Sequence, residues 1–542
     1  MGQNLLWWQC GVIYEIYPRS FQDSNGDGIG DLEGIRQRLP YLVELGIDAI
    51  WICPFYKSPM RDFGYDVADY CQVDSIFGTL EDFDLLVQTA HALNLKVMID
   101  FVPNHTSSDH PWFMESRSSR TNPKRDWYIW KDAKPDGTPP NNWIADWSGS
   151  AWEWDNTTQQ YYLHLFLREM PDLNWRSPEV VQTMLDVLCF WLERGVDGFR
   201  MDVVYCIMKD PQWRDNPVNT GKPRGNKSLG WFDTQVHLHD RGHADVHGIL
   251  KQFRALLDDY STDRPRFSIG EIFVSDWQEW SSYYGQGDEL HMPFNFALMN
   301  LEWHPAKICK VIETVEQTIS SIPNAFPNYV LGNHDDRRLA TRLGLAKARS
   351  AMLLLLTLRG TPTLYYGDEI GMTDGAIAPE LEQDPWGKFQ PELGRDPART
   401  PMQWNNMANA GFCAAAAQPW LPVVENFAQV NVVQQQQDAQ SILTFTRRLL
   451  RLRRTQVPLT KGTYRTVYQD DRVLIFERRY TTEQCWIAIN FSSDTISLEL
   501  PILKGQILLS THCDRQDELS EWLELQADEG VLIQQDEAMS VL

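Results

Sequence analysis

Eight short segments rich in β-branched and aromatic residues recur along this chain, with amphipathic helical patterns between them. Strands that alternate with helices favour parallel pairing, because each helix carries the chain back to start the next strand in the same direction. In a chain of 542 residues, eight such units predict a (β/α)8 TIM barrel. The eight segments are residues 11–17, 48–54, 95–101, 196–202, 266–272, 291–296, 328–335 and 361–367.

Two parts of the chain do not follow the barrel pattern. The third and fourth predicted strands are separated by about 70 residues more than one βα unit needs. The extra segment, residues 104–172, is aromatic and rich in turn residues, and it predicts a small subdomain inserted after the third strand. After residue 457, strands separated by short turns predict a C-terminal antiparallel β-sandwich over residues 458–542. The barrel itself is then expected over residues 1–103 and 173–457.

The chain is acidic, with 49 Lys and Arg against 73 Asp and Glu and a net charge of −24. This charge repels phosphate backbones and anionic lipid headgroups, so we expect neither nucleic acid nor a membrane as partner. The longest apolar stretch, Ala351–Leu358, is far shorter than the roughly 20 residues that span a bilayer. The cysteines are scattered and form no CxxC pair, which predicts reduced thiols. The N-terminus is unlike a signal peptide, so we expect a cytoplasmic protein. We expect it to be a monomer or a homodimer.

Polar residues at the ends of the predicted strands mark a candidate active site, because a barrel of this type carries its site there. Asp202, Glu271 and Asp335 end the fourth, fifth and seventh strands. Arg200 points to the same face as Asp202 and is expected to lower the pKa of that carboxyl group. Burial and neighbouring carboxylates are expected to raise the pKa of Glu271. One charged and one protonated carboxyl group are what retaining glycoside hydrolysis requires.

A structural role is the alternative for these charges. Arg200 and Asp202 would then form an ion pair that holds the barrel together, and Glu271 would be a residue of the rim. Three carboxylates at strand ends, with His105 and His334 beside them, favour a functional site instead.

Six segments resemble, in order, the signature of the α-amylase family of glycoside hydrolases (family 13), in its α-glucosidase and oligo-1,6-glucosidase branch. The resemblance covers nearly the whole chain. It implies that Asp202 is the nucleophile, Glu271 the acid/base and Asp335 the transition-state stabiliser. It also implies that the residues gripping the sugar in the first subsite are His105, Arg200 and His334. The segments are DFVPNH (100–105), MPDLN (170–174), GFRMD (198–202), GEI (270–272), NHD (333–335) and GTPTLYYGDEIG (360–371).

Two further segments extend the resemblance, RDFGYD (61–66) and RDPARTPMQW (395–404). There the family uses an aspartate, a stacking tyrosine and an arginine to close the pocket around a non-reducing glucose. This implies Asp62, Tyr65 and Arg399 in those roles, and release of single glucose units from chain ends. A salt bridge on the rim and a core tyrosine are the alternative. We also assign Phe166 and Val203 to the substrate pocket.

The preferred linkage stays open. In the resembled branch the residue after the nucleophile, here Val203, tends to be Val in α-1,6-cleaving members and Ala or Thr in α-1,4-cleaving members. Residues 205–235 instead resemble maltase-like members, so we expect a general α-glucosidase acting on maltose, isomaltose or other short α-glucosides. Transfer to a sugar acceptor, an oligo-1,6-glucosidase and sucrose or trehalose conversion are alternatives. A non-catalytic relative is opposed by the complete set of carboxylates.

The loop from residue 23 to 31 begins with the D-x-N-x-D-G pattern of a calcium loop. It is not an EF-hand, because Gly34 stands where that motif needs a glutamate and a strand precedes the loop. Its oxygens can still surround one hard cation, as the same loop does in the resembled branch. We therefore expect one structural divalent cation, Ca²⁺ rather than Mg²⁺, and no organic cofactor; a plain turn is the alternative. The expected ligands are Asp23, Asn25, Asp27, Asp31 and the Ile29 carbonyl.

Overall fold

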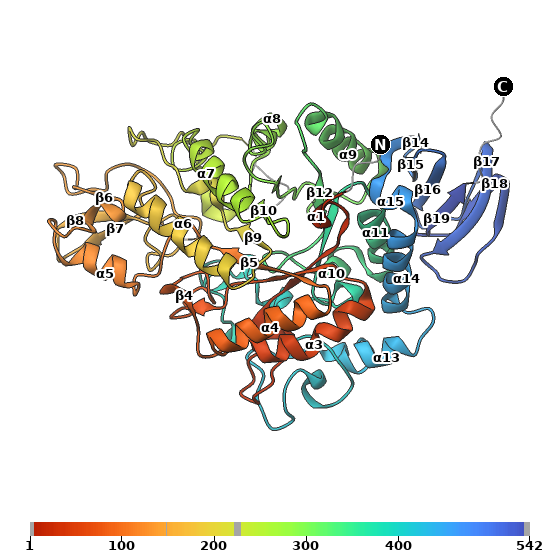
Figure 1. Cartoon of the computed structure of the whole chain (residues 1–542), viewed down its shortest axis with the longest axis horizontal. Coiled ribbons are helices and arrows are strands. Elements are labelled where there is room, and N and C mark those ends of the chain that lie inside the picture. The colour runs from red at the N-terminus through yellow and green to blue at the C-terminus, as the bar shows by residue number, and fades with distance from the viewer. Residues whose placement is uncertain (1–4, 148, 222–228, 536–542) are drawn as a thin grey trace.

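The computed structural model of the chain describes residues 5–147, 149–221 and 229–535. Its centre is one sheet of eight parallel strands, in the order β11-β10-β9-β5-β2-β1-β13-β12 (Figure 1). Each strand lies inside one of the eight predicted segments, which confirms the predicted barrel. The strands are β1 (Ile13–Ile16), β2 (Ala49–Ile52), β5 (Lys96–Phe101), β9 (Gly198–Met201), β10 (Phe267–Gly270), β11 (Met292–Pro293), β12 (Asn328–Val330) and β13 (Thr361–Tyr365).

A buried side chain joins the two ends of this strand order. The Nδ2 of Asn328, at the start of β12, donates to the carbonyl of Pro293 in β11 at 2.6 Å. Its Oδ1 accepts from the backbone N–H of Asn295 at 2.9 Å. The side chain of Asn328 thus links β12 to β11, the two edge strands of this order.

A helix follows each barrel strand along the chain. In α4, Thr79 and Asp82 form a capping box, in which each side chain accepts from the backbone N–H of the other residue. Its buried side chains include Phe83, Leu86 and Ala90, at the helical spacing that the sequence shows. The eight helices are α3 (Leu32–Leu45), α4 (Leu80–Ala92), α6 (Pro178–Glu193), α7 (Val246–Asp259), α8 (Trp277–Ser282), α9 (Pro305–Ile319), α11 (Leu345–Thr357) and α14 (Ile442–Thr455).

Shorter elements lie in the connections between these units. They are α1 (Trp7–Cys10), α2 (Pro18–Phe21), β3 (Tyr56–Lys57), β4 (Asp69–Val73), α10 (Leu339–Leu343), α12 (Pro385–Phe389), α13 (Val432–Gln436) and α15 (Val457–Lys461). The pair β3 and β4 forms a small antiparallel sheet of its own.

The segment between β5 and α6 has its own small aromatic core. It contains a three-stranded antiparallel sheet in the order β6-β8-β7 and one short helix. Phe113 of the helix stacks on Trp130 of the sheet, with ring centroids 5.6 Å apart. The sequence did not predict this helix, because only Phe113 and Ser116 are buried in it and no apolar stripe results. The elements are α5 (Pro111–Ser118), β6 (Trp130–Lys131), β7 (Trp152–Asp155) and β8 (Gln160–Leu163).

The C-terminal strands form a six-stranded antiparallel sheet in the order β14-β15-β16-β19-β17-β18, at the opposite end of the molecule from β6–β8 (Figure 1). Successive residues of β15 face opposite sides. Leu474 and Phe476 belong to the main core with the barrel, whereas Val473 and Ile475 pack in a second core with residues of β17 and β18. The strands are β14 (Thr463–Gln469), β15 (Val473–Tyr480), β16 (Glu483–Asn490), β17 (Ile496–Ser510), β18 (Glu518–Leu525) and β19 (Gly530–Gln535).

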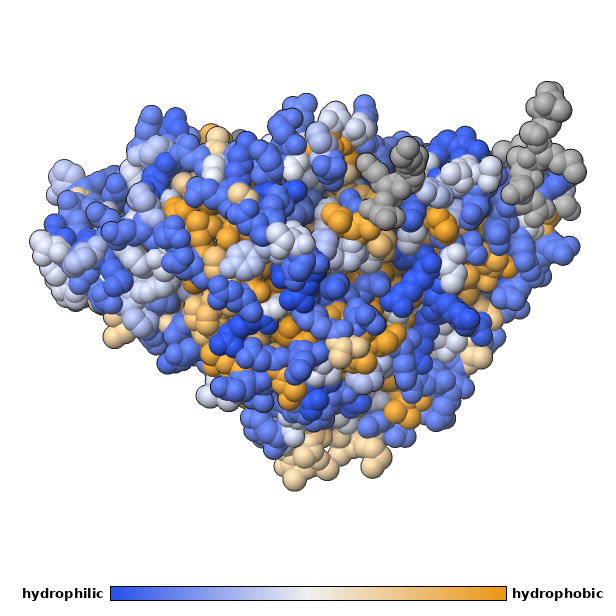
Figure 2. All heavy atoms as spheres, viewed as in Figure 1, coloured by the Kyte–Doolittle hydropathy of each residue, from blue (hydrophilic) through white to orange (hydrophobic). Residues whose placement is uncertain are grey.

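The outer surface is polar, as the composition predicts. Figure 2 shows that hydrophilic residues cover most of the molecule in this view, with hydrophobic residues scattered between them. Among the described residues, no helix combines the length and apolar character needed to cross a bilayer. All nine cysteines are free thiols.

Candidate active site

A cavity of about 510 Å³ lies at the carboxyl ends of the barrel strands. It contains the three predicted catalytic carboxylates and most of the predicted substrate residues. The remaining three, Arg200, His334 and Arg399, each contact residues that line it. The predicted residues in its wall are Asp62, Tyr65, His105, Phe166, Asp202, Val203, Glu271 and Asp335.

One guanidinium group holds the two central carboxylates. The Nη1 of Arg200 lies 2.6 Å from Oδ1 of Asp202, and its Nη2 lies 2.6 Å from Oε2 of Glu271. Nη1 is also 2.6 Å from Oδ1 of Asp100. Asp202 and Glu271 thus bind neighbouring nitrogens of one planar group, which places the two carboxyl groups next to each other.

The expected low pKa of Asp202 is wrong for the free protein. Burial raises the pKa of Asp202 well above its usual range, and Arg200 offsets this only in part because it is shared with Asp100 and Glu271. Burial also raises the pKa of Glu271, as expected. The two carboxyl groups repel each other when both are ionised, and this repulsion disfavours the doubly charged pair. A nucleophilic role for Asp202 requires the state in which Asp202 is ionised and Glu271 is protonated.

The turn after β9 directs a further hydrogen bond at Glu271. Val203 has a left-handed backbone, with φ 32° and ψ 39°, which is rare for a β-branched residue. Its N–H donates to Oε2 of Glu271 at 3.0 Å. Arg200 and Val203 therefore both engage Oε2, and neither contact uses Oε1.

Asp335 sits between two arginines. Its Oδ1 is 2.9 Å from Nη2 of Arg399 and 3.2 Å from Nη1 of Arg395. Burial alone would raise the pKa of Asp335, but His334, Arg395 and Arg399 outweigh it and hold that pKa well below its usual range. Asp335 therefore stays ionised and can face a positive charge that develops on a substrate.

Asp62 pairs with an arginine that is not among the predicted site residues. Arg395, not Arg399, makes the direct ion pair, with Nη2 2.7 Å from Oδ1 of Asp62. The same Nη2 lies 2.6 Å from Oδ1 of Asp384, and the guanidinium lies over the ring of Trp147. Burial raises the pKa of Asp62 to about 7 although Arg395 opposes this. Arg399 donates instead to the carbonyl of His334 at 2.8 Å.

Aromatic and imidazole rings form another wall of the cavity. Tyr65 stacks on His334, with centroids 5.5 Å apart, and Phe166 lies 5.1 Å from the ring of His105. Burial lowers the pKa of His105 to about 3, so this ring is neutral. Its Nε2 has no hydrogen-bond partner among the described residues. A neutral polar atom in an aromatic wall suits a sugar hydroxyl.

The sequence matches the family of the α-amylase catalytic domain over residues 15–462. The chain belongs to the α-amylase family of glycoside hydrolases. The match spans all eight barrel strands except the first two residues of β1, together with the inserted segment.

Individual relatives of this α-amylase family chain match over nearly its full length. A probable α-glucosidase of Rhizobium meliloti (strain 1021) is 42% identical over 535 residues, 95% of this chain and 96% of that protein. An oligo-1,6-glucosidase of Heyndrickxia coagulans is 38% identical, with 94% and 96% covered. The crystal structure of an α-glucosyl transfer enzyme, XgtA, has a TM-score of 0.92 at 40% identity, with 98% and 100% covered. This protein is therefore a glycoside hydrolase.

In the loop with the calcium-like pattern, side chains accept hydrogen bonds from the backbone of the same loop. Oδ1 of Asp23 accepts from the N–H groups of Asn25 and Gly26, and Oδ2 accepts from Gly28. Asn25 and Asp27 each accept one further backbone N–H. These bonds use both lone pairs of Oδ1 of Asp23 but leave one on its Oδ2 and one on each bonded Oδ1 of Asn25 and Asp27. In Asp31, Oδ1 accepts from the Ser24 hydroxyl and the Gly34 N–H, and Oδ2 accepts from the Ser24 N–H. The oxygen-only donor set fits a hard cation.

Two residues of the site were missed by the sequence analysis. Arg395 opens the segment from which only Arg399 was chosen, and the pattern gave no reason to choose between them. Glu15 lies inside β1 and is fully buried, with Oε1 2.6 Å from Nδ1 of His334. A charged residue within the buried run GVIYEIY is the signal that could have found it.

Proposed function

We propose that this glycoside hydrolase is a retaining, exo-acting α-glucosidase that releases glucose from the non-reducing end of short α-glucosides such as maltose or isomaltose. The observation that carries the proposal is the pairing of Asp202 and Glu271 on adjacent nitrogens of Arg200. Retaining hydrolysis needs two carboxyl groups about 5 to 5.5 Å apart. Two carboxylates on one guanidinium are close enough for this, whereas an inverting mechanism needs room for a water between them.

The proposed reaction has two displacements. In the first, an oxygen of Asp202 bonds to C1 of glucose, the bond from C1 to the leaving oxygen breaks, and Glu271 gives its proton to that oxygen. In the second, Glu271 takes a proton from water, whose oxygen replaces Asp202 at C1. Each displacement inverts C1, so the glucose keeps the α configuration. Ionised Asp335 stabilises the positive charge that develops on the sugar ring.

The pairing of Asp62 with Arg395 supports exo action. This ion pair is buried, and both residues line the cavity together with Trp147. A cavity closed by such a pair accepts the end of a sugar chain and excludes its interior. The sugar binds between this pair and the wall formed by Tyr65 and Phe166.

Transfer of glucose to a sugar acceptor is a second activity that we propose for the same residues. A sugar hydroxyl in place of water in the second displacement needs no further catalytic group. The similarity to an α-glucosyl transfer enzyme, at a TM-score of 0.92 and 40% identity, supports it.

The linkage preference is proposed as broad, with oligo-1,6-glucosidase activity as the alternative. Val203 lines the cavity and favours α-1,6 bonds, as does the 38% identity to an oligo-1,6-glucosidase. The maltase-like stretch after it favours α-1,4 bonds, although its residues 222–228 lie outside the described residues. Sucrose conversion is a further alternative, since the crystal structure of a MutB mutant in complex with the substrate sucrose has a TM-score of 0.88 at 33% identity.

Product analysis tests the proposed function. The protein is incubated with maltose, isomaltose, sucrose, trehalose, nigerose and maltotriose labelled at its reducing end. We expect unlabelled glucose and labelled maltose from the maltotriose, and α-glucose as the first anomer seen by NMR. Initial β-glucose would exclude the retaining mechanism. Labelled glucose that appears before labelled maltose would exclude attack from the non-reducing end, whereas labelled glucose that forms later comes from cleavage of the labelled maltose. Asp202→Asn is the control for contaminating glucosidases.

We also propose that the loop of Asp23, Asn25, Asp27, Asp31 and the Ile29 carbonyl binds one structural Ca²⁺. A ligand that binds only the folded state at 100 times its Kd stabilises it by about 2.7 kcal/mol. Chelation with EDTA is therefore expected to lower Tm by about 3 °C, and added Ca²⁺ to restore it more effectively than Mg²⁺.

The matched variants for this test are Asp27→Ala and Asp136→Ala. Asp136 is an exposed turn residue that accepts from the backbone and hydroxyl of Thr138. Asp27→Ala is expected to abolish the response to EDTA and Asp136→Ala to leave it intact. A wild-type Tm that is indifferent to EDTA and to added Ca²⁺ would show that the loop is a plain turn.

A further inference from the structure

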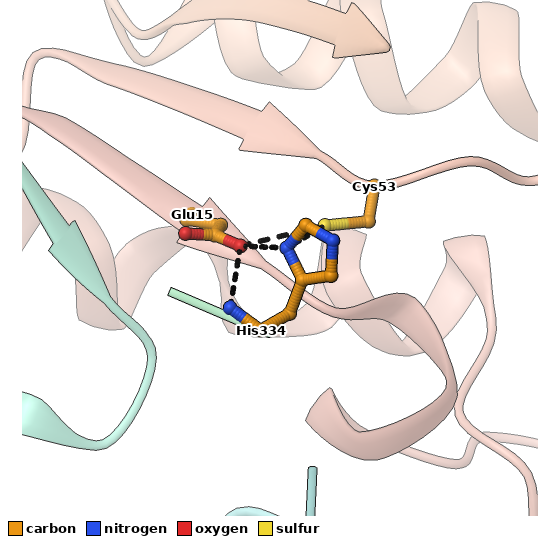
Figure 3. A group of neighbouring side chains, drawn as sticks. All are labelled: Glu15, Cys53 and His334. Atoms are coloured by element: carbon orange, nitrogen blue, oxygen red, sulfur yellow. Dashed lines mark hydrogen bonds and ion pairs between the residues drawn. The ribbon is translucent and has the colours of Figure 1, made fainter. Parts of the chain in front are cut away.

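Glu15 is a buried carboxyl group that the proposed mechanism does not use. It lies in the middle of β1 and is fully buried. Its Oε1 accepts from the backbone N–H of His334 at 3.2 Å and lies 2.6 Å from Nδ1 of the same residue (Figure 3). The Sγ of Cys53 is 3.7 Å from both Oε1 and Nδ1. Glu15 thus contacts His334 twice, from the side of the ring away from Tyr65.

These three side chains form hydrogen bonds rather than a metal site. Their ligand atoms lie within 4.8 Å of one another, but Oε1 of Glu15 and Nδ1 of His334 are already in direct contact at 2.6 Å. The Cys53 thiol lies within hydrogen-bonding distance of the same two atoms, 3.7 Å from each. The contact between Glu15 and His334 is therefore a hydrogen bond whose proton must be placed.

The ring of His334 is fixed on its other sides by the active site. It stacks on Tyr17, with ring centroids 6.0 Å apart, and on Tyr65, with ring centroids 5.5 Å apart. Its Nε2 lies 2.8 Å from the Tyr65 hydroxyl and 3.5 Å from Oδ2 of Asp335. The two ring nitrogens therefore face different groups: Nδ1 faces Glu15, and Nε2 faces two residues of the cavity wall.

The charges around the ring decide which nitrogen carries the hydrogen. Burial lowers the pKa of His334 to about 3, so the ring is neutral and has one N–H. Nε2 faces two groups: Asp335, which is ionised and can only accept, and the Tyr65 hydroxyl, which can accept from Nε2 while it donates to Oδ2 of Asp100. A hydrogen on Nε2 satisfies both contacts and leaves Nδ1 as an acceptor. Burial raises the pKa of Glu15 well above its usual range, against the attraction of Arg200 and with the repulsion of Asp335 and Asp100. Glu15 is then a carboxylic acid that donates to Nδ1.

We propose that Glu15 is a positioning residue: its carboxylic acid holds His334 in the tautomer that carries its hydrogen on Nε2, toward Asp335 and the bound sugar. One hydroxyl oxygen of Glu15 donates to Nδ1 and also accepts from the backbone N–H of His334. A glutamine amide nitrogen donates but does not accept, and an alkyl side chain does neither. The inference rests on the proposed function and adds a residue that acts through His334 at the same site.

Substitutions at residue 15 test this role. Glu15→Leu is expected to lower kcat/KM on p-nitrophenyl α-glucoside by about 100-fold, the cost of losing one preorganised donor. Glu15→Gln is expected to lose only about 10-fold, because its amide still donates to Nδ1. The control is Glu369→Gln, since Glu369 is equally buried but accepts from Tyr14 and Tyr41 away from the cavity. It is expected to stay within about 3-fold of the wild type at a similar Tm.

A double-mutant cycle separates positioning from a structural role. In a His334→Ala background, Glu15→Leu and Glu15→Gln are expected to cause no further loss, because their effect passes through the ring. The same fold loss in both backgrounds, or a Glu15→Leu rate equal to that of the control, would overturn the inference. If Glu15→Leu does not fold, the cycle with Glu15→Gln distinguishes the positioning role from a structural role. An inactive wild-type protein would contradict the proposed function instead. Failure of the proposed function can therefore be distinguished from failure of the positioning role of Glu15.

Discussion

Replacing Asp202 with asparagine is expected to lower kcat/KM on p-nitrophenyl α-glucoside by at least about 10⁴-fold, as loss of a nucleophile does in other enzymes. The amide keeps the shape of the side chain but cannot form the bond to C1. Tm is expected to stay the same or rise. A carboxyl group whose pKa is raised in the folded state lowers stability once the pH exceeds its unfolded pKa, and Asp202 is such a group. Initial rates and thermal unfolding check both parts.

The control for this variant is Asp155→Asn. Asp155 is also buried and bonded to an arginine, with Oδ1 2.6 Å from Nε of Arg117, but it lies in the inserted segment. Its replacement is expected to leave kcat/KM nearly unchanged. Azide added to Asp202→Gly is expected to attack C1 from the face that the carboxylate leaves open, expelling p-nitrophenolate and giving β-glucosyl azide. An α-glucosyl azide, or an Asp202→Asn variant as active as the control, would contradict the nucleophilic role.

The barrel and the three carboxylates at its strand ends could be predicted from the sequence because both depend on the order of strand and helix patterns along the chain. Residues 196–202 form a short run directly after a helical pattern, so they predict strand β9 and place Asp202 at its end. The rule that polar side chains gather at strand ends then brings Glu271 and Asp335 to the same cavity. None of these steps needs knowledge of which strands are neighbours.

Contacts between strands could not be predicted in the same way. The spacing of Arg200 and Asp202 shows that they share a face, but not that Asp100 and Glu271 share the same guanidinium from the strands on either side. This sharing, with burial, is why the expected pKa of Asp202 was wrong. A 3-10 turn separates Arg395 from Arg399, and the two side chains contact different groups: Arg395 pairs with Asp62, whereas Arg399 contacts Asp335 and the His334 carbonyl. The types of the residues in such a turn do not predict the path of its backbone.

Replacing Glu271 with glutamine is expected to have an effect that depends on the leaving group. On maltose, kcat/KM is expected to fall by about 10³-fold, within the range for loss of a general acid. On p-nitrophenyl α-glucoside the fall is expected to be much smaller, because p-nitrophenolate leaves without a proton. The wild-type rate on maltose is expected to decline as the pH rises through the raised pKa of Glu271, since only the protonated form acts as the acid. Glutamine at residue 271 does not titrate, so the decline of the rate at alkaline pH is expected to be absent in the variant.

The dependence on the leaving group distinguishes loss of an acid from general damage to the site. Glu289→Gln is the control, because Glu289 is a buried carboxylate bonded to His247 at 2.6 Å on the helical side of the barrel. Any loss in that variant is expected to be the same for both substrates. An equal loss on both substrates in Glu271→Gln, with the alkaline decline retained, would mean that another group protonates the leaving oxygen. Burial also raises the pKa of Asp202, so that residue would be the candidate acid, and the two proposed roles would be exchanged.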